Sequence, residues 1–140
     1  MSLSKTTTTK YIAEFEYEAT NRTGNVVKVD MYDEPERKQA QSPMELLLSA
    51  AAACAAVDVV GMLKKKRKTV EGLSVVAEGQ RREQHPRHYT DILMKFHLSS
   101  PDTSETDLAK VVALAVDKYC SVAATLRGVA EVRYESEVVS

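Results

Sequence analysis

The stretch "SPMELLLSAAAAC", residues 42–54, decides the fold because it begins as a capped helix and ends on a cysteine. Ser42 stands at the N-cap, Pro43 at the first helical position and Glu45 at the third, which is the pattern of a capping box. Leucines then continue the helix toward the cationic run "KKKRK", and cations suit the negative end of a helix dipole. Serine and four alanines precede Cys54. Side chains this small let a second backbone pack closely, or they leave the sulfur accessible.

The length and composition of the chain limit the classes of function that it can have. A chain of 140 residues predicts one domain, which we expect over residues 11–140 after a flexible leader at 1–10. Nineteen Lys and Arg residues balance 20 Asp and Glu residues, so neither nucleic acid nor an anionic membrane is expected as a partner. The uncharged run 46–57 is shorter than the roughly 20 residues that a membrane span needs. Two cysteines and a polar start indicate a cytoplasmic protein.

Hydrophobic patterning predicts an α+β fold with antiparallel sheets and two main helices. Alternating apolar residues predict a half-buried strand in "YIAEFEYEA" (11–19) and a returning strand in "VVKVDMY" (26–32). Two further strands are expected in "LSVVAEG" (73–79) and "YTDILMKFHL" (89–98), and one more at 132–138. Hairpins without βαβ spacing favour antiparallel pairing.

The second main helix follows "SPDTSETD" and is expected to carry one apolar stripe. Its members are Leu108, Val111, Val112, Ala115, Val116 and Tyr119. A short helix, "CSVAATLRG", comes next and begins at Cys120. Since the positive end of a helix dipole favours an anion, this position predicts a lowered pKa for the Cys120 thiol.

Several residue types are candidates for chemistry, and each has a plain structural alternative. Either cysteine alone also fits an inert buried thiol. Arg37 and Arg22 lie in predicted loops, where a guanidinium either faces solvent or lowers the pKa of a neighbouring thiol. The pair in "HPRH" (85–88) lacks the three or four ligands of a zinc site, so no metal or cofactor is expected.

The two cysteine motifs, "SPMELLLSAAAAC" and "KYCSVAATLR", resemble those of the OsmC/Ohr family of osmotically inducible and organic-hydroperoxide-resistance proteins. The element order and the hairpin "HPRHYTDILMKFHL" are similar too, so the resemblance covers the chain from about Tyr11 onward. It implies an intertwined homodimer with two sites at the subunit interface. In a thiol peroxidase of this kind, Cys54 attacks an organic hydroperoxide and Cys120 resolves the sulfenic acid to a disulfide. An external dithiol then reduces that disulfide.

Two positions depart from the pattern that the resemblance implies for active members. Met44 stands where active members carry a glutamate that orients the arginine. Ser121 follows Cys120, where active members frequently have a proline. Arg37 is the expected activating arginine, with Arg22 as the alternative. Glu45 is better explained by the cap than by catalysis. The resemblance therefore implies a divergent, bacterial oxidative-stress protein, and a redox-sensing or small-ligand-binding dimer is the alternative to the peroxidase.

Overall fold

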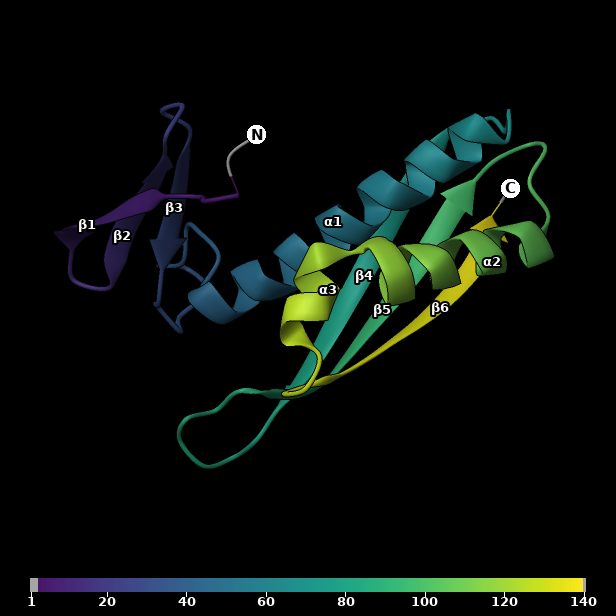
Figure 1. Cartoon of the computed structure of the whole chain (residues 1–140). Helices are drawn as coiled ribbons and strands as arrows, with labels where there is room; N and C mark the ends of the chain where they lie inside the picture. The colour runs from purple at the N-terminus through teal and green to yellow at the C-terminus, as the bar shows by residue number, and fades with distance from the viewer. Residues whose placement is uncertain (1–2, 140) are drawn as a thin grey trace. The chain divides into compact units, whose positions relative to one another are not determined.

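The computed structural model describes residues 3–139 and has the predicted α+β composition (Figure 1). Its contacts group the chain into two compact units, Met1–Leu47 and Leu48–Ser140, where the sequence predicted one domain. The first strand, β1, spans Thr7–Ala13. Residues 7–10 therefore form strand, and the predicted flexible leader was too long.

The first unit contains an antiparallel sheet of β1, β2 (Glu16–Asn21) and β3 (Val26–Asp30), with β2 in the middle. The prediction of one strand over residues 11–19 was wrong, because the chain turns at residues 14 and 15. Phe15 takes the left-handed conformation at φ 62°, which is rare for a bulky residue, and its carbonyl accepts a hydrogen bond from the Met31 amide at 3.0 Å. No glycine, proline or asparagine marks this turn.

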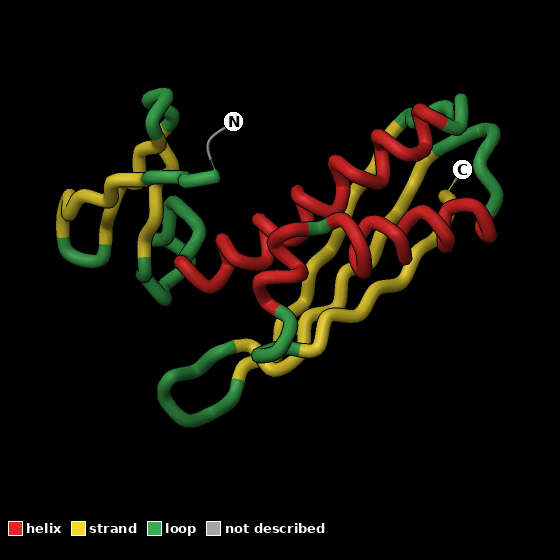
Figure 2. Tube along the Cα trace, viewed as in Figure 1, coloured by secondary structure: helices red, strands yellow, loops and turns green. Residues whose placement is uncertain are grey.

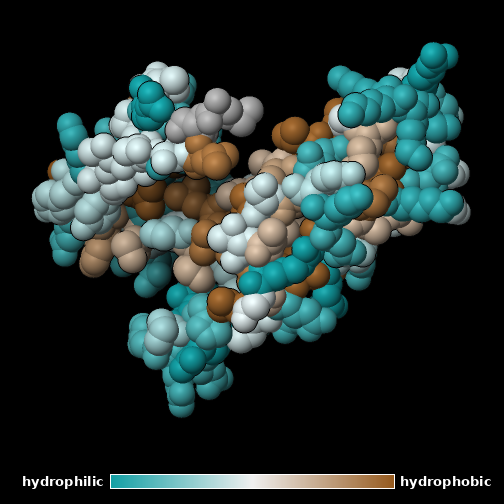
Figure 3. Space-filling view, in the orientation of Figure 1, coloured by the Kyte–Doolittle hydropathy of each residue, from teal (hydrophilic) through white to brown (hydrophobic). Residues whose placement is uncertain are grey.

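One face of the first sheet is apolar and the other is charged. Tyr11 pairs with Tyr17, which also pairs with Val29, while Lys10, Glu18 and Lys28 alternate with them on the opposite face. Tyr11 is 67% exposed, and hydrophobic residues are visible at the surface of both units (Figure 3). The apolar face of this sheet is thus accessible in a single chain.

The second unit has a mixed sheet in the order β4 (Gly72–Arg81), β5 (Tyr89–Ser99) and β6 (Glu131–Val139). The first two strands form the predicted antiparallel hairpin, but β6 runs parallel to β5, so purely antiparallel pairing was wrong. The two strands are joined through helices α2 (Glu105–Leu114) and α3 (Ser121–Leu126). A helical crossover of this length can return the chain to the same end of the sheet, which a parallel pair requires.

The core of the second unit lies between this sheet and the helices on one of its faces (Figure 1). Four alternate residues of β5 are fully buried there: Ile92, Met94, Phe96 and Leu98. Burying each such side chain stabilises the fold by about 1.5–3 kcal/mol. The opposite face carries ion pairs such as Lys95–Glu78, as the strand alternation predicts.

The long helix α1 spans Pro43–Lys65 and starts with the predicted capping box. The Glu45 amide donates to Ser42 Oγ at 3.2 Å, and the Ser42 amide donates to Glu45 Oε1 at 2.9 Å. One stripe of α1 is buried: Ala51, Ala55, Val59 and Leu63. Within residues 3–139, α1 alone is long and apolar enough to cross a membrane, a composition that it shares with core helices of soluble proteins.

Candidate functional site

Cys54 lies in the middle of α1, beside the buried stripe, and is partly exposed. The small residues around it have a structural reason. Ala51, three residues before Cys54, is buried, and its carbonyl oxygen lies 3.8 Å from the Sγ of Cys120. A bulky stripe would hold the two segments apart, so the alanines bring the second cysteine close to the first.

Cys120 reaches this position through a π-helical turn, η1 (Ala115–Tyr119), that follows α2. The Cys120 amide donates to the Ala115 carbonyl at 2.7 Å, five residues back instead of four. The extra residue rotates the stripe, so that Tyr119 is 51% exposed and Cys120 is 2% exposed. The prediction that Tyr119 belongs to the buried stripe was therefore wrong, and the thiol takes its place.

The helix breaks at Cys120 before α3 begins, as the short non-helical corner in Figure 2 shows. Cys120 is the N-cap of α3, and its Sγ accepts a hydrogen bond from the Ala123 amide at 3.3 Å. The thiol is thus oriented from two sides, by the carbonyl of Ala51 and by this amide.

The structure brings the two cysteines together as free thiols, because Cys120 Sγ lies 3.8 Å from the carbonyl of Ala51, three residues before Cys54 in α1. Burial raises the pKa of Cys120 most strongly, and the neighbouring Cys54 thiol raises it further. Donation from the amides of Ala123 and Val122 lowers the pKa by less. The expected lowering was therefore wrong in sign, because loss of solvent outweighs the start of a short helix.

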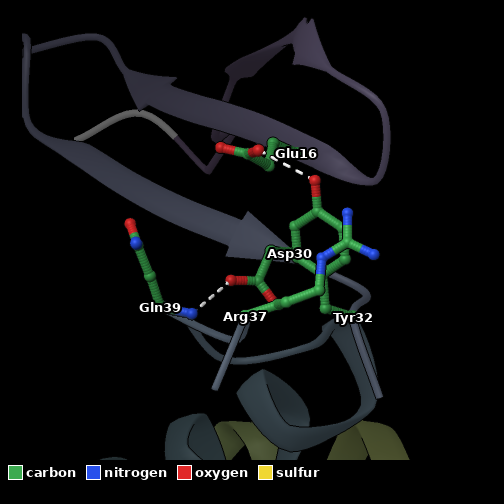
Figure 4. Close-up of a pocket in the computed structure, with 5 residues that line it drawn as sticks. All are labelled: Glu16, Asp30, Tyr32, Arg37 and Gln39. Atoms are coloured by element: carbon green, nitrogen blue, oxygen red, sulfur yellow. Dashed lines mark hydrogen bonds between the residues drawn. The ribbon is translucent and has the colours of Figure 1, made fainter. Parts of the chain in front are cut away.

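Arg37 lies in the first unit, where its guanidinium stacks over the ring of Tyr32 at 4.4 Å from the centroid. Tyr32 donates to Glu16 Oε2 at 3.0 Å, and this hydrogen bond is the largest cause of its raised pKa. These residues line a cavity of about 240 Å³ together with Asp30 and Gln39 (Figure 4). The cavity combines an aromatic ring, a cation and carboxylates.

Asp30 anchors the loop that carries Arg37. Its carboxylate accepts hydrogen bonds from the amides of Gln39 and Ala40 at 2.7 and 2.8 Å and from Lys38 Nζ at 3.3 Å. Burial raises the pKa of Asp30, but these donors lower it by more, so it lies below the usual value. The loop is thus held rigidly from within the first unit.

The other predicted candidates belong to the first unit. Glu45 serves the cap and pairs with Lys38 at 3.3 Å, and the Ser42 amide is the main cause of its lowered pKa. Arg22 is exposed in the turn between β2 and β3. Since both arginines belong to the first unit and both thiols to the second, the role of Arg37 or Arg22 stays a prediction.

Sequence reasoning missed the π-helical turn and the residues that hold it. Arg127 Nη2 donates to the Val116 carbonyl at 2.7 Å, and Asp117 accepts from both Arg127 and the Tyr134 hydroxyl. No local spacing announces these contacts, because the partners come from three elements. Within residues 3–139, no group of three or more His, Cys, Asp or Glu side chains is placed to hold a metal ion.

Comparison with known proteins identifies the family and agrees with the fold. The family model of the OsmC-like proteins matches residues 35–135, which include both cysteines. Protein YhfA of Escherichia coli strain K12 is 39% identical over 102 residues, covering 73% of this chain and 76% of that protein.

Solved structures show the same fold. An OsmC-like protein from Mycoplasma pneumoniae superposes with a TM-score of 0.86 at 20% identity over the full length of both chains. An organic hydroperoxide resistance protein, OsmC, from Legionella pneumophila superposes with a TM-score of 0.70 at 18% identity, over 99% of this chain and 100% of that one. By the family model and by its identity to YhfA, the chain belongs to the family of OsmC-like proteins.

Proposed function

We propose that the protein is a two-cysteine thiol peroxidase that reduces organic hydroperoxides. One observation carries this proposal: two free thiols on separate helices lie close together, since the Sγ of Cys120 is 3.8 Å from the carbonyl of Ala51 on the helix of Cys54, with one thiol partly exposed and one buried. A nucleophilic thiol needs access to its substrate, whereas a resolving thiol needs only access to the first sulfur. A structural neighbour is itself named an organic hydroperoxide resistance protein, which supports the choice of substrate.

The proposed reaction has two steps on this pair. The Cys54 thiolate attacks one peroxide oxygen, forming an S–O bond and breaking the O–O bond, and the alkoxide leaves and takes up a proton as an alcohol. Cys120 then loses its proton and attacks the sulfenic sulfur, so that an S–S bond forms, the S–O bond breaks and water leaves. An external dithiol reduces the disulfide by thiol–disulfide exchange, and no resident cofactor is required.

Burial favours this division of roles. Cys54 is partly exposed, while Cys120 is 2% exposed and has a raised pKa, so it keeps its proton until the sulfenic acid has formed. Cys120 is then poised next to the sulfur that it must attack. The reverse assignment would put the first chemical step on the thiol that a peroxide reaches least easily.

Arg37 is the proposed activating residue of the peroxidase. Its guanidinium is held against Tyr32 in a loop that Asp30 ties down, which supports a fixed rather than a mobile cation. A fixed guanidinium stabilises a thiolate and the developing alkoxide. The family resemblance assigns an arginine to this role, with Arg22 as the alternative.

The proposed assembly is an intertwined homodimer in the cytoplasm. The apolar face of the first sheet, which contains Tyr11 and Tyr17, is exposed in a single chain, as is Val57 of α1 at 72%. A three-stranded sheet needs a packed apolar face for stability, so a second copy of the chain is the proposed cover. Neither nucleic acid nor a membrane is part of the proposal.

A redox-sensing or ligand-binding dimer is the second candidate. Met44 stands where the family resemblance places a glutamate, and the raised pKa of Cys120 disfavours rapid turnover at neutral pH. A redox sensor of this kind would be oxidised once, without turnover. A ligand-binding dimer would hold a small molecule and consume no peroxide.

The test is to add one equivalent of tert-butyl hydroperoxide to the reduced protein, count free thiols and measure the intact mass. The proposal expects both thiols to disappear, an intramolecular disulfide to form and a dithiol to sustain turnover. Cys54→Ser should abolish peroxide consumption, and Cys120→Ser should stop at sulfenic acid and then over-oxidise. Full activity of Cys54→Ser would refute the assignment, and oxidation without turnover would favour the second candidate.

A further inference from the structure

The helix that ends at Cys120 leaves carbonyl groups without helical partners. After η1 the backbone turns away, with Cys120 at φ −72° and ψ 107°, so the last carbonyls of the helix cannot be paired within it. One side chain satisfies two of them. Arg127 donates from Nη2 to the Val116 carbonyl at 2.7 Å and from Nη1 to the Asp117 carbonyl at 3.2 Å.

Arg127 also forms an ion pair with the side chain of Asp117, with Nη2 and Oδ1 3.1 Å apart. A planar guanidinium holds its acceptors in one fixed geometry, whereas the three donors of an ammonium group rotate on a flexible stem. Arg127 is itself the C-cap of α3. The end of α3 is therefore tied directly to the end of η1.

A third element completes the arrangement. The second carboxylate oxygen of Asp117 accepts a hydrogen bond from the Tyr134 hydroxyl in β6, and this bond is the main cause of the raised pKa of Tyr134. We call Asp117, Arg127 and Tyr134 the Arg127 clamp. It joins η1, α3 and the edge strand of the sheet.

Cys120 lies in the loop of chain that the clamp closes. Asp117 precedes the thiol and Arg127 follows it, so the contacts between these two residues help to fix the angle between η1 and α3. The same angle determines whether the Sγ of Cys120 meets the Ala51 carbonyl and the neighbouring thiol of Cys54. No atom of the clamp is required to touch either sulfur.

We propose that Arg127 is a positioning residue for disulfide formation: through the clamp it holds Cys120 where its sulfur can attack Cys54. This inference rests on the proposed function for the sulfenic acid step, in which Cys120 loses a proton, the S–S bond forms, the S–O bond breaks and water leaves. It assigns no role to Arg127 in the first step. Loss of the clamp should therefore slow resolution and leave oxidation of Cys54 unchanged.

The experiment compares Arg127→Gln with the wild type after rapid mixing with tert-butyl hydroperoxide. Sulfenic acid is trapped with dimedone, and the disulfide is measured by mass. We expect Cys54 oxidation within about twofold of the wild-type rate and disulfide formation slower by about tenfold to a hundredfold, the range for a misplaced reactive group. Excess peroxide should then convert more Cys54 to sulfinic acid.

Matched variants separate positioning from general damage. Arg133→Gln removes the same charge from an arginine of β6 that pairs with Asp91 at 3.8 Å outside the clamp, and it should behave as wild type. Tyr134→Phe loses one hydrogen bond of the clamp and should slow resolution less than Arg127→Gln. Arg127→Lys should be intermediate. If Arg127→Gln does not fold, as judged by circular dichroism, Arg127→Lys and Tyr134→Phe carry the test.

A second reaction needs no peroxide and tests the clamp alone. Dithiodipyridine forms a mixed disulfide at Cys54 and releases one thiopyridone, and attack by Cys120 then releases the second. The proposal expects the second release to slow in Arg127→Gln by the same factor as disulfide formation. An unchanged second release in the folded variant would overturn the inference. Failure of wild-type Cys54 to react with peroxide would instead overturn the proposed function and leave this result decisive for the clamp.

Discussion

Replacing Gly79 with alanine tests the packing beside α1, the helix that carries Cys54. Gly79 lies in β4, and a Cβ at this position would stand 2.4 Å from Cε1 and 2.7 Å from Cδ1 of Tyr89. It would also stand 3.1 Å from a methyl group of Leu48, the residue six positions before Cys54 in α1. Tyr89 is 6% exposed, so its ring has little room to move away.

The expected magnitude follows from two opposing effects. Adding a methyl group to a filled site costs about 1–3 kcal/mol, because the neighbours must leave their preferred rotamers. Alanine in place of glycine in a strand restores about 0.5–1 kcal/mol of backbone entropy. The difference spans about 0–2.5 kcal/mol, and because the new Cβ would stand 2.4 Å from a ring carbon, we expect Gly79→Ala to lower the free energy of unfolding by an amount in the upper half of that range.

The assay is urea denaturation at one fixed protein concentration, with Gly72→Ala as the matched control. Gly72 lies in the same strand, but a Cβ there would meet only the Cβ of Ser99 at 4.0 Å. This variant should be as stable as the wild type or more stable by about 0.5–1 kcal/mol.

A double-mutant cycle identifies the clashing group. In a Tyr89→Leu background the aromatic carbons nearest to the new methyl group are gone, so Gly79→Ala should cost clearly less than it does alone. Equal stability of Gly79→Ala and Gly72→Ala would refute the reasoning. An unchanged cost in the Tyr89→Leu background would show that the ring is not the obstacle.

Three further predictions concern the cap and the titrating groups. Ser42→Ala removes the hydroxyl that accepts from the Glu45 amide, and it should lower the free energy of unfolding by about 1 kcal/mol in urea denaturation; no change would show that the cap is idle. Because the folded-state pKa of Asp30 is lowered, its contribution to stability is complete above the ordinary pKa of 3.8 and is lost as the pH falls through the folded-state pKa. Melting curves of wild type and Asp30→Asn should therefore converge in acid, and a constant gap would contradict this. In Cys54→Ser, alkylation of Cys120 by iodoacetamide should titrate at a higher pH in the folded protein than in urea, because burial is the largest cause of its raised pKa. A lower pH for the folded protein would contradict it.

Local signals in the sequence predicted most elements of the fold. The capping box at Ser42 specifies the start of α1 by chemistry between residues three positions apart, and the structure confirms it. Strict alternation in β5 predicts its buried face for the same reason, since neighbouring side chains of a strand point to opposite sides. The two cysteine motifs likewise identified the family, and the comparisons confirm it.

Local sequence signals gave the wrong structure where two different arrangements of strands have the same alternation of apolar and polar residues. The alternation predicts one strand where the structure has the hairpin of β1 and β2, because the turn at Phe15 keeps the alternation on both sides. A hydrogen bond from Met31, in another part of the chain, stabilises that turn. The parallel pairing of β6 was missed for a similar reason. A strand pattern shows which face is buried but not the direction from which the strand arrives.

The candidate site, too, was predicted in part from the sequence and decided in part by the tertiary structure. The sequence by itself identified the family, through two cysteines in matching motifs, and it marked both thiols as candidates for chemistry. Only the tertiary structure decided that they meet, because one extra residue in a π-helical turn rotates Cys120 inward and small side chains on α1 leave room for it. It also reversed the expected direction of the Cys120 pKa. Burial is a property of everything packed around a thiol, and no spacing along the chain records it.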